Sequence, residues 1–401
     1  MVNYFGDNMS SFDVAIIGAG PAGSTLARYM AEKGYKVAVI DKKKEIGVPL
    51  QCAGLLGRKI KELNVLPKEF IINEVNGAYL HSPSNNILKV SKKDTQAYVI
   101  NRVGYDQHLA EIAEAEGAEF LYKHKVKSVN NSSGKIIMAN QGHKELSAKV
   151  IVGADGHSSI VSQSFNKSSK TFNAAQYLIE TPKPLETNFV ELHVNSNISP
   201  GFIWSIPISE THSRIGLFGN HDYKTLTNFL EEFMISNSHF TGSNIIKKYQ
   251  GKIPVFDPKK DLVNKRSILL GDAASQVKPT TGGGLLIGFA CAKIASGVVS
   301  RALDNEKFSD LKDYESQFKK RYWKELKTQI MVQKTFELLN NNDLDQMFIK
   351  SKEKGLENII SEYGDMDSQS LLIKELFKRG LIFDILPKIF YRSVSQIWKF
   401  F

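Results

Sequence analysis

Cysteine is scarce in this chain, which has two cysteines, Cys52 and Cys291, among 401 residues. Two thiols so far apart cannot supply the disulfide framework that stabilises small secreted proteins, and this usage is typical of a reducing compartment. Neither cysteine lies in a cluster with metal-ligand spacing. The composition therefore favours a protein that works inside the cell.

Long apolar runs are also missing. No stretch of about eighteen or more uninterrupted apolar residues occurs, so the sequence does not predict a membrane-spanning helix. The first eleven residues are polar and lack the apolar region of a signal peptide. We expect a cytoplasmic protein whose membrane contact would be peripheral, at the inner face.

Several catalytic signatures are absent. His157 and His193 have no metal-ligand partners at a useful spacing in the sequence, so no metal is predicted. Ser158 and Ser159 lack the sharp turn that presents a nucleophilic serine, which argues against a hydrolase. No motif indicates nucleic-acid binding, so no nucleic-acid partner is expected.

The length and charge of the chain give positive information. Its 401 residues suffice for two or three domains, and a hydrophobic content of 42% is typical of a globular protein. Lysine and arginine outnumber aspartate and glutamate by 52 to 42, a formal net charge of +10. This excess favours anionic partners such as phosphorylated substrates or acidic membrane surfaces.

The most informative pattern opens the folded part of the chain. A strand pattern at residues 12–17 runs into the glycine turn GAGPAG at 18–23. A helix pattern follows to Lys33, and a second strand at 36–40 ends on Asp41. Strand, glycines, helix, second strand and terminal acid follow in the order that a dinucleotide-binding site requires.

Each residue type in this pattern has a physical role. Gly18 permits a tight turn, Gly20 lets the backbone approach a pyrophosphate, and Gly23 lets the helix pack closely on the strand. The helix N-terminus adds free amides and a positive dipole. Asp41 is placed to accept hydrogen bonds from ribose hydroxyls.

A second glycine-rich motif lies late in the chain. Gly271-Asp272, followed by Gly282-Gly283-Gly284-Leu285, resembles the second flavin fingerprint of flavoproteins similar to p-hydroxybenzoate hydroxylase. In those proteins the aspartate bonds the ribityl chain, and the glycine turn presents amides to the flavin edge. Asp272, Gly284 and Leu285 match these positions. Together with Gly-Ala-Asp-Gly at 153–156, the motifs imply FAD rather than NAD as the tightly bound cofactor.

The remaining segments suggest how the chain is organised. Alternating segments at 78–81, 189–194 and 201–219, rich in aromatic and β-branched residues, indicate a separate sheet. From about residue 311 the sequence shows helix patterns and no strand signal. We therefore expect an α/β fold: a Rossmann-like FAD-binding domain of p-hydroxybenzoate hydroxylase type, with an inserted antiparallel sheet domain and a helical C-terminal region. The expected boundaries are 1–75, 95–165 and 262–310 for the FAD-binding domain, 76–94 and 166–261 for the substrate-binding sheet domain, and 311–401 for the helical region.

Within that superfamily the chain resembles the geranylgeranyl reductases, and most of all the archaeal digeranylgeranylglycerophospholipid reductases, along at least residues 12–300. The loop at 46–54, which contains Cys52, resembles the cysteine-bearing loop of the family. Residues 99–106 resemble its strand-to-helix segment with an Arg and an Asp. Residues 202–207 resemble a Tyr-x-Trp-x-Phe-Pro segment that lines the prenyl cavity.

This chain departs from the family pattern at four places. Phe202 replaces the Tyr and Ile206 replaces the Phe of the cavity segment, and Ile208 stands where the family often has Lys, so the resemblance does not fix the shape of the cavity. Ser162 and Gln163 stand where related hydroxylases have an Arg after the Gly-Ala-Asp-Gly turn.

The motifs and the resemblance together imply a set of cofactor-binding residues. They are Gly18, Gly20, Ala22, Gly23, Asp41, Cys52, Ala53, Leu55, Arg102, Val126, Asp272, Gly284 and Leu285. The resemblance assigns Ala22 to the pyrophosphate, Asp41 to the adenosine ribose and Val126 to the adenine. Arg102 offers a planar fork of donors suited to phosphate oxygens, and the alternative for it is a surface ion pair with Asp106.

Two features of the sequence allow more than one interpretation. Cys52 is a candidate proton donor to the alkene carbon that receives no hydride, or it is a packing or redox-gating residue. Phe202, Trp204 and Pro207 are candidate substrate-pocket residues, and their alternation suits an apolar tunnel or an ordinary sheet core.

The C-terminal region has two stretches of mixed bulky apolar and basic residues at helical spacing, 371–379 and 389–401. Either stretch could form an interfacial helix on an anionic membrane surface, and packing against the flavin domain is the alternative.

These inferences predict an FAD-dependent reductase that saturates isolated double bonds of geranylgeranyl chains on precursors of archaeal membrane phospholipids, with the sheet domain supplying the pocket. The alternatives are an aromatic-ring hydroxylase, which shares the flavin motifs but uses oxygen and NAD(P)H, and a non-catalytic prenyl-binding escort protein. No second dinucleotide clamp is present, so we expect an electron donor such as ferredoxin or a reduced nucleotide.

Overall fold

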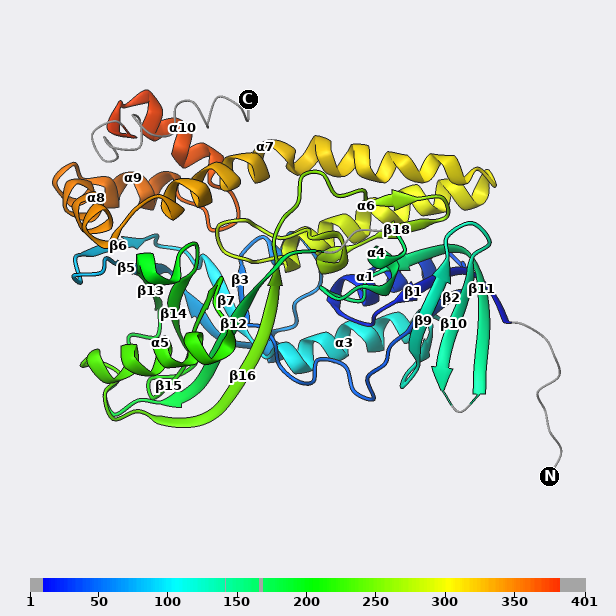
Figure 1. Ribbon diagram of the computed structural model, residues 1–401, viewed down its shortest axis with the longest axis horizontal. Coiled ribbons are helices and arrows are strands. Elements are labelled where there is room, and N and C mark those ends of the chain that lie inside the picture. The colour runs from blue at the N-terminus through cyan, green and yellow to red at the C-terminus, as the bar shows by residue number, and fades with distance from the viewer. Residues whose placement is uncertain (1–9, 141, 166–168, 383–401) are drawn as a thin grey trace.

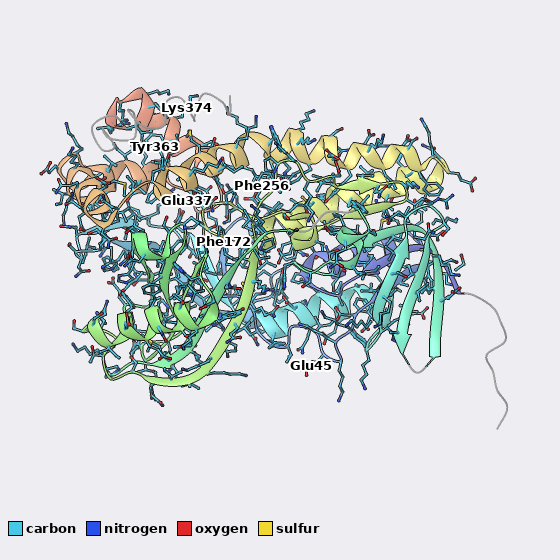
Figure 2. All side chains as sticks on the ribbon, viewed as in Figure 1. Glu45, Phe172, Phe256, Glu337, Tyr363 and Lys374 are labelled. Carbon is cyan, nitrogen blue, oxygen red and sulfur yellow. The ribbon has the colours of Figure 1, made fainter. Side chains whose placement is uncertain are left out.

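The computed structural model describes residues 10–140, 142–165 and 169–382. Within these ranges the strands form three sheets, which lie in two halves of an elongated molecule (Figure 1). The long helix α7 (Lys312–Glu337) runs along both halves. Side chains fill the space between α7 and the two large sheets (Figure 2).

The first sheet has eight strands and a parallel centre. Its strands are β1 (Ser10–Ile17), β2 (Val37–Ile40), β8 (Glu119–Leu121), β9 (Lys125–Asn130), β10 (Lys135–Asn140), β11 (Gly142–Gly153), β17 (Val263–Asn264) and β18 (Ser267–Leu269). β1 lies between β2 and β11, and it runs parallel to both. Residues 14–17 of β1 and all of β2 are buried, as expected for parallel strands covered on both faces.

The second sheet has seven strands. They are β5 (Gly77–His81), β6 (Ile87–Ser91), β12 (Thr171–Glu180), β13 (Phe189–Val194), β14 (Phe202–Pro207), β15 (His212–Gly219) and β16 (Asn244–Pro254). Neighbouring strands are antiparallel except β5 and β13, which run parallel. The expected antiparallel sheet is therefore present, with one parallel pair in it. The β5–β6 hairpin comes from a much earlier part of the chain, so a long connection rather than a hairpin joins it to β13.

A three-stranded sheet links the two halves. It contains β3 (Leu55–Gly57), β4 (Ile71–Val75) and β7 (Ala97–Ile100). Because β4 continues almost directly into β5, this sheet connects the flavin motifs to the seven-stranded sheet.

The helices cover these sheets. They are α1 (Pro21–Ala31), α2 (Ile60–Leu63), α3 (Arg102–Ala115), α4 (Ile160–Gln163), α5 (Tyr223–Ser236), α6 (Leu285–Asp304), α7, α8 (Asn341–Glu353), α9 (Leu356–Tyr363) and α10 (Ser370–Lys378), with 3-10 turns at Lys68–Phe70, Ser196–Ile198, Gly271–Ala274 and Phe308–Leu311. Helices α8, α9 and α10 pack over β5, β6 and β13 through one apolar cluster.

Helix α6 is long and apolar enough to cross a membrane by length and composition. However, 61% of its most apolar window is buried inside the protein, where α6 packs against α1. Core helices of this kind pass the same test, so α6 is explained by its position in the fold.

Candidate flavin and substrate site

The opening glycine turn has the geometry that its glycines predict. Gly18 has φ of +105°, and a Cβ there would lie 2.3 Å from the Ala154 carbonyl oxygen. A Cβ on Gly23 would lie 2.1 Å from the carbonyl oxygen of Gly18, so only glycine allows α1 to approach β1 this closely. A Cβ on Gly20 would meet nothing within 4 Å, because this residue faces a cavity.

Asp41 ties this turn to the end of β2. Its carboxylate accepts hydrogen bonds from the backbone N–H of Ala19 and of Lys43, both at 2.8 Å. The carboxylate therefore has a fixed position beside the turn, and it lines the same cavity as Gly18 and Gly20.

The late glycine motif closes the other end of this cavity. A 3-10 turn at Gly271–Ala274 carries Asp272, whose side chain projects into the cavity. The surrounding protein raises the pKa of Asp272 to about 6 by desolvation, and the positive charge of Arg102 opposes this rise. Gly284 and Leu285 begin α6 with no side-chain cap, which leaves the first amides of that helix open.

The cavity between the two motifs has a volume of about 1040 Å³. Most of the predicted cofactor-binding residues line it: Gly18, Gly20, Ala22, Asp41, Cys52, Leu55, Arg102, Val126, Asp272, Gly284 and Leu285. Two predicted residues are not among its lining residues. Gly23 packs beneath the turn, and Ala53 lines a second cavity instead.

Arg102 lies in the wall of this cavity in a paired state. Its Nε and Nη2 donate to the two carboxylate oxygens of Asp106 at 3.1 and 2.9 Å, and both side chains are about nine-tenths buried. The ion pair with Asp106 therefore forms, but inside the protein rather than on its surface. This pairing fixes the guanidinium beside the cavity.

The residues present fit FAD. Helix α1 has no side-chain cap at Gly20, so its first amides remain available to an anion, and Gly20 leaves room for close approach. Asp155 lines the cavity with one buried oxygen, Oδ1, that has no hydrogen-bond partner. Free amides and the unpartnered Asp155 oxygen beside the opening turn, with Asp272 at the other end, suit the phosphates and hydroxyls of a dinucleotide.

A second, apolar cavity of about 1290 Å³ lies in the other half. From β14, alternate residues Phe202, Trp204 and Ile206 line it. Pro207, which the sequence analysis placed in the pocket, is not among its lining residues. Successive side chains of a strand point to opposite faces, so 207 cannot share the face of 202, 204 and 206. Its carbonyl oxygen accepts a hydrogen bond from Asn73 instead.

The helical C-terminal region forms one wall of this apolar cavity. Phe336 of α7, Phe348 of α8, Ile360 of α9 and Leu376 of α10 line it opposite the sheet. The sequence analysis assigned the pocket to the sheet domain, and the helical region adds the opposite wall of this cavity. Stretch 371–379 largely coincides with α10, which packs on α7 and α9 and exposes Leu371 and Phe377. Stretch 389–401 lies outside the described residues.

Cys52 stands where the two cavities meet, and it lines both. The backbone N–H of Gly54 donates to its Sγ at 3.4 Å. Arg214 holds the loop by donating to the Ala53 carbonyl oxygen at 2.7 Å and to that of Ile100 at 3.1 Å. Arg102 also interacts with the Cys52 thiol. The cysteine loop is thus positioned from both halves of the protein.

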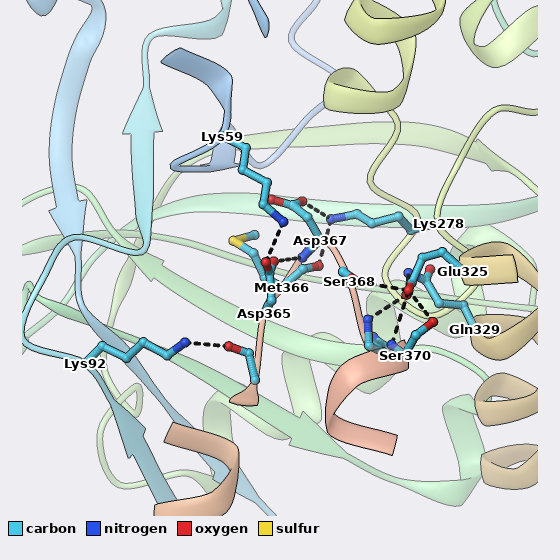
Figure 3. A network of polar contacts seen from close by, with 12 residues as sticks. Lys59, Lys92, Lys278, Glu325, Gln329, Asp365, Met366, Asp367, Ser368 and Ser370 are labelled. Atoms are coloured by element: carbon cyan, nitrogen blue, oxygen red, sulfur yellow. Dashed lines mark hydrogen bonds and ion pairs between the residues drawn. The ribbon is translucent and has the colours of Figure 1, made fainter. Parts of the chain in front are cut away.

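Residues 364–370, the segment after α9 together with the first residue of α10, cross the same junction (Figure 3). Asp367 accepts from Lys278 Nζ at 2.7 Å, and both side chains are nearly buried. Asp365 accepts from Lys59 Nζ at 2.6 Å, and the Gly364 carbonyl oxygen accepts from Lys92 at 2.8 Å. Two ion pairs and a hydrogen bond therefore fix this segment between the cavities.

The far end of the segment is anchored on α7. The Glu325 carboxylate accepts from the backbone N–H of Gln369 at 2.6 Å and from the Ser368 hydroxyl at 2.9 Å (Figure 3). Hydrogen bonds from Ser370, Gln369 and neighbouring residues lower the pKa of Glu325, although desolvation acts the other way. Glu325 is thus held as a carboxylate that binds the segment.

Sequence reasoning missed Lys278, Asp365 and Asp367. Lys278 lies between Asp272 and Gly282, so its place inside the late flavin motif was an available signal. Nothing local marked the two aspartates, because their partners are far away in the chain.

For His193, the sequence spacing shows no metal-ligand partner. The structure places His81 and Glu191 beside it. His81 and His193 lie on different strands and are far apart in the sequence, so no spacing motif could show the group.

Comparison with known proteins defines the class. Residues 11–292 match the FAD-binding domain family, so the chain belongs to this family and FAD is its cofactor. The chain is 33% identical to an uncharacterized protein of Methanocaldococcus jannaschii, over 94% of this chain and 99% of that protein.

Two further comparisons narrow the family. The chain is 30% identical to the digeranylgeranylglycerophospholipid reductase of Methanococcus vannielii, over 84% of this chain and 89% of that enzyme. Its fold is similar to the crystal structure of a geranylgeranyl bacteriochlorophyll reductase-like protein from Thermoplasma acidophilum, with a TM-score of 0.84, 24% identity and coverage of 97% and 100% of the two chains. The chain thus belongs to the family of the digeranylgeranylglycerophospholipid reductases.

Proposed function

We propose that this protein is an FAD-dependent reductase that saturates isolated double bonds of geranylgeranyl chains on a glycerophospholipid precursor. One observation carries the proposal: the flavin cavity and a long apolar cavity meet at Cys52. The apolar cavity exceeds the roughly 300–1,000 Å³ of ordinary small-molecule sites, which suits a long chain rather than a compact ring. Membership of the reductase family supports the same assignment.

When bound and reduced, FAD supplies hydride chemistry that no protein side chain offers. The chain's own residues bind, orient and desolvate the substrate. Trp204, Phe202 and the helices α7–α10 enclose an isoprenoid tail between apolar walls, which excludes water from the double bond. We also propose that the sheet half and the helical region form the substrate-binding part of the molecule, and that the glycine-motif half binds the cofactor.

We propose Cys52 as the proton donor to the second alkene carbon. Its Sγ borders both cavities, so it can reach a double bond that lies against the flavin. Loss of the proton would leave a thiolate, and a proton from solvent would restore the thiol. Arg214 holds the loop of this cysteine by donating to the Ala53 carbonyl oxygen at 2.7 Å.

A lipid substrate and a redox partner follow from this reaction. We propose a ferredoxin or a reduced nucleotide as electron donor, and a peripheral position at the cytoplasmic face of the membrane. The net charge of +10 would favour an acidic partner protein and anionic headgroups. The exposed Leu371 and Phe377 of α10 give this helix apolar side chains at the surface near the lipid cavity.

The central experiment is mass spectrometry of a digeranylgeranylglycerophospholipid after anaerobic incubation with the dithionite-reduced holoenzyme. We expect mass gains in steps of two hydrogens. An oxygen-dependent gain of one oxygen atom would support the hydroxylase instead. A protein that purifies without FAD and still binds the lipid would support the escort protein.

The role of Cys52 has its own test. Cys52→Ala should retain FAD and lose most of its alkene-reducing rate, while Cys52→Ser should keep a small part of it. Unchanged turnover in Cys52→Ala with full FAD content would exclude the proton-donor role and leave the reductase assignment intact.

A further inference from the structure

The seven-stranded sheet carries a second cluster of titratable side chains, on the face away from the apolar cavity. We propose that His81, Glu191 and His193 form a binding site for a divalent transition metal, with Zn²⁺ as the ion that suits it best. Among the described residues, these three bring one ligand atom each to within 4.8 Å of one another.

The strand register builds the group. His81 ends β5 and lies directly opposite His193 on the parallel strand β13. Glu191 stands two residues before His193, so strand periodicity places both on the same face. The two imidazole rings stack, with centroids 4.0 Å apart and planes at 20°.

The ligand atoms lie close to one another. Glu191 Oε2 lies 3.1 Å from His193 Nε2 and 3.8 Å from His81 Nε2. His81 Nδ1 lies 2.8 Å from the Asn85 side-chain oxygen, which can only accept a hydrogen bond. Asn85 therefore favours the tautomer that carries its proton on Nδ1, which leaves the Nε2 lone pair of His81 directed at the group.

The missing hydrogen-bond partner of His81 Nε2 matters because this nitrogen is buried. His81 and His193 are 8% and 7% exposed, and His81 Nε2 is a buried nitrogen with no hydrogen-bond partner. A buried polar nitrogen without a partner costs free energy, so native proteins rarely keep one. A metal ion between the three side chains would satisfy this nitrogen and neutralise the carboxylate together.

The donor set selects the kind of ion. Two imidazole nitrogens and one carboxylate oxygen suit zinc and its transition-metal neighbours, whereas Mg²⁺ and Ca²⁺ prefer all-oxygen sites. Zinc binds such atoms at roughly 2.0–2.2 Å, so the two stacked rings would turn toward a common centre when the ion binds.

The position of the site argues for a structural role. Leu80 and Leu192 line the apolar cavity on one face of the sheet. They are adjacent to the ligands on the same two strands. His193 lies on the other face, where it contacts Phe233 of α5. An ion there would join β5 to β13 and make no contact with substrate. The inference is therefore independent of the reductase assignment.

Metal uptake by the FAD-loaded full-length protein tests the proposal. The protein is first treated with a chelator and then titrated with Zn²⁺ by calorimetry, with metal content measured after gel filtration. We expect one equivalent of bound Zn²⁺ and a melting temperature that rises with Zn²⁺, because an ion that binds only the native state stabilises it.

Variants locate the bound ion. His81→Ala and His193→Ala should weaken Zn²⁺ binding by roughly 100-fold or more, since loss of an outer-shell partner alone costs about 10–100-fold. Both should retain FAD, and the matched control His212→Ala, on β15 of the same sheet, should bind as the wild type does. If an alanine variant fails to fold, His193→Gln replaces it, with the 450 nm flavin absorbance reporting the native state.

Two results would overturn the proposal. One is a wild-type protein that takes up no stoichiometric zinc and shows no rise in melting temperature. The other is a stoichiometric zinc site that His81→Ala, His193→Ala and His193→Gln leave unchanged, which would place the ion elsewhere.

Discussion

The two cavities that meet at Cys52 are built by different means. The flavin cavity is lined by the two glycine turns and by polar side chains such as Asp41, Arg102 and Asp272. The apolar cavity is formed by side chains from a sheet and from the four helices α7–α10. The sheet and these helices lie far apart in the chain. Binding a cofactor of fixed shape needs a fixed backbone, whereas enclosing a flexible tail needs only apolar surface of the right extent.

The segment at 364–370 lies between the flavin cavity and the apolar cavity. It is polar and ion-paired, and Met366 and Asp367 line both cavities. A Cβ on Gly57 would lie 1.9 Å from an Asp367 oxygen, so the segment packs directly against the backbone of β3. The boundary between polar and apolar chemistry is thus supplied by the part of the chain in which sequence reasoning saw only helices.

Removing the ion pair that holds this segment should have the largest effect on the stability of the protein. Lys278→Met leaves Asp367 as an unpaired and nearly buried carboxylate, which should cost about 3–5 kcal/mol of unfolding free energy. Chemical denaturation measures the loss, and the double variant with Asp367→Leu should recover part of it. As a control, Lys319→Met breaks an exposed pair with Glu315 and should change stability by about 0.5 kcal/mol or less. Equal effects in both variants would show that the junction pair is not special.

Substitutions at two glycines of the opening turn should distinguish the stability of the fold from the binding of the cofactor. Gly23→Ala places a Cβ against the Gly18 carbonyl and should cost about 1–3 kcal/mol of stability by overpacking. Gly20→Ala meets no protein atom, so the apoprotein should keep its melting temperature while FAD affinity falls. Differential scanning fluorimetry and flavin titration distinguish the two. A Gly20→Ala variant with wild-type FAD affinity would contradict the role given to this turn.

Filling the apolar cavity should affect catalysis and leave the flavin in place. Ala174→Trp puts a large side chain on the cavity face of β12 and should lower kcat/KM for the lipid by about tenfold or more, equivalent to about 1.4 kcal/mol. FAD content and its reduction by dithionite should not change. Glu180→Trp, on the exposed end of the same strand, is the control. A parallel loss of FAD would mean that the cavities are not separable.

The smallest expected effect is a pH dependence of FAD affinity. The pKa of Asp272 is raised to about 6, so its carboxylate is ionised at pH 7 and mostly protonated at pH 5. If the ionised form accepts hydrogen bonds from the cofactor, affinity should fall by up to about tenfold between these two pH values. Flavin fluorescence titrations measure this change. Asp272→Asn should bind more weakly at pH 7 and lose most of the dependence, and a wild type with flat affinity would refute the assignment.

The two regions also differ in how far the sequence predicts them. The glycine turn and Asp41 are local patterns whose physical requirements can be read from neighbouring residues. The role of Asp272, the fold class and FAD followed from the resemblance to known flavoproteins, and the family match confirms the fold class and FAD. Pro207 was misplaced because a family segment was taken whole, although strand alternation separates it from Trp204. The parallel pairing of β5 with β13 and the ion pairs at 365 and 367 depend on tertiary contacts that no local pattern encodes.

The pairing of β5 with β13 has a consequence for synthesis of the protein. The hairpin of β5 and β6 leaves the ribosome long before residues 189–194, so one edge of β5 has no partner while more than a hundred residues are added. Exposed strand edges recruit other chains, and nascent chains with long-range pairings are prone to aggregate. Expression yield should therefore depend on chaperones that shield this early hairpin until translation reaches its partner strand.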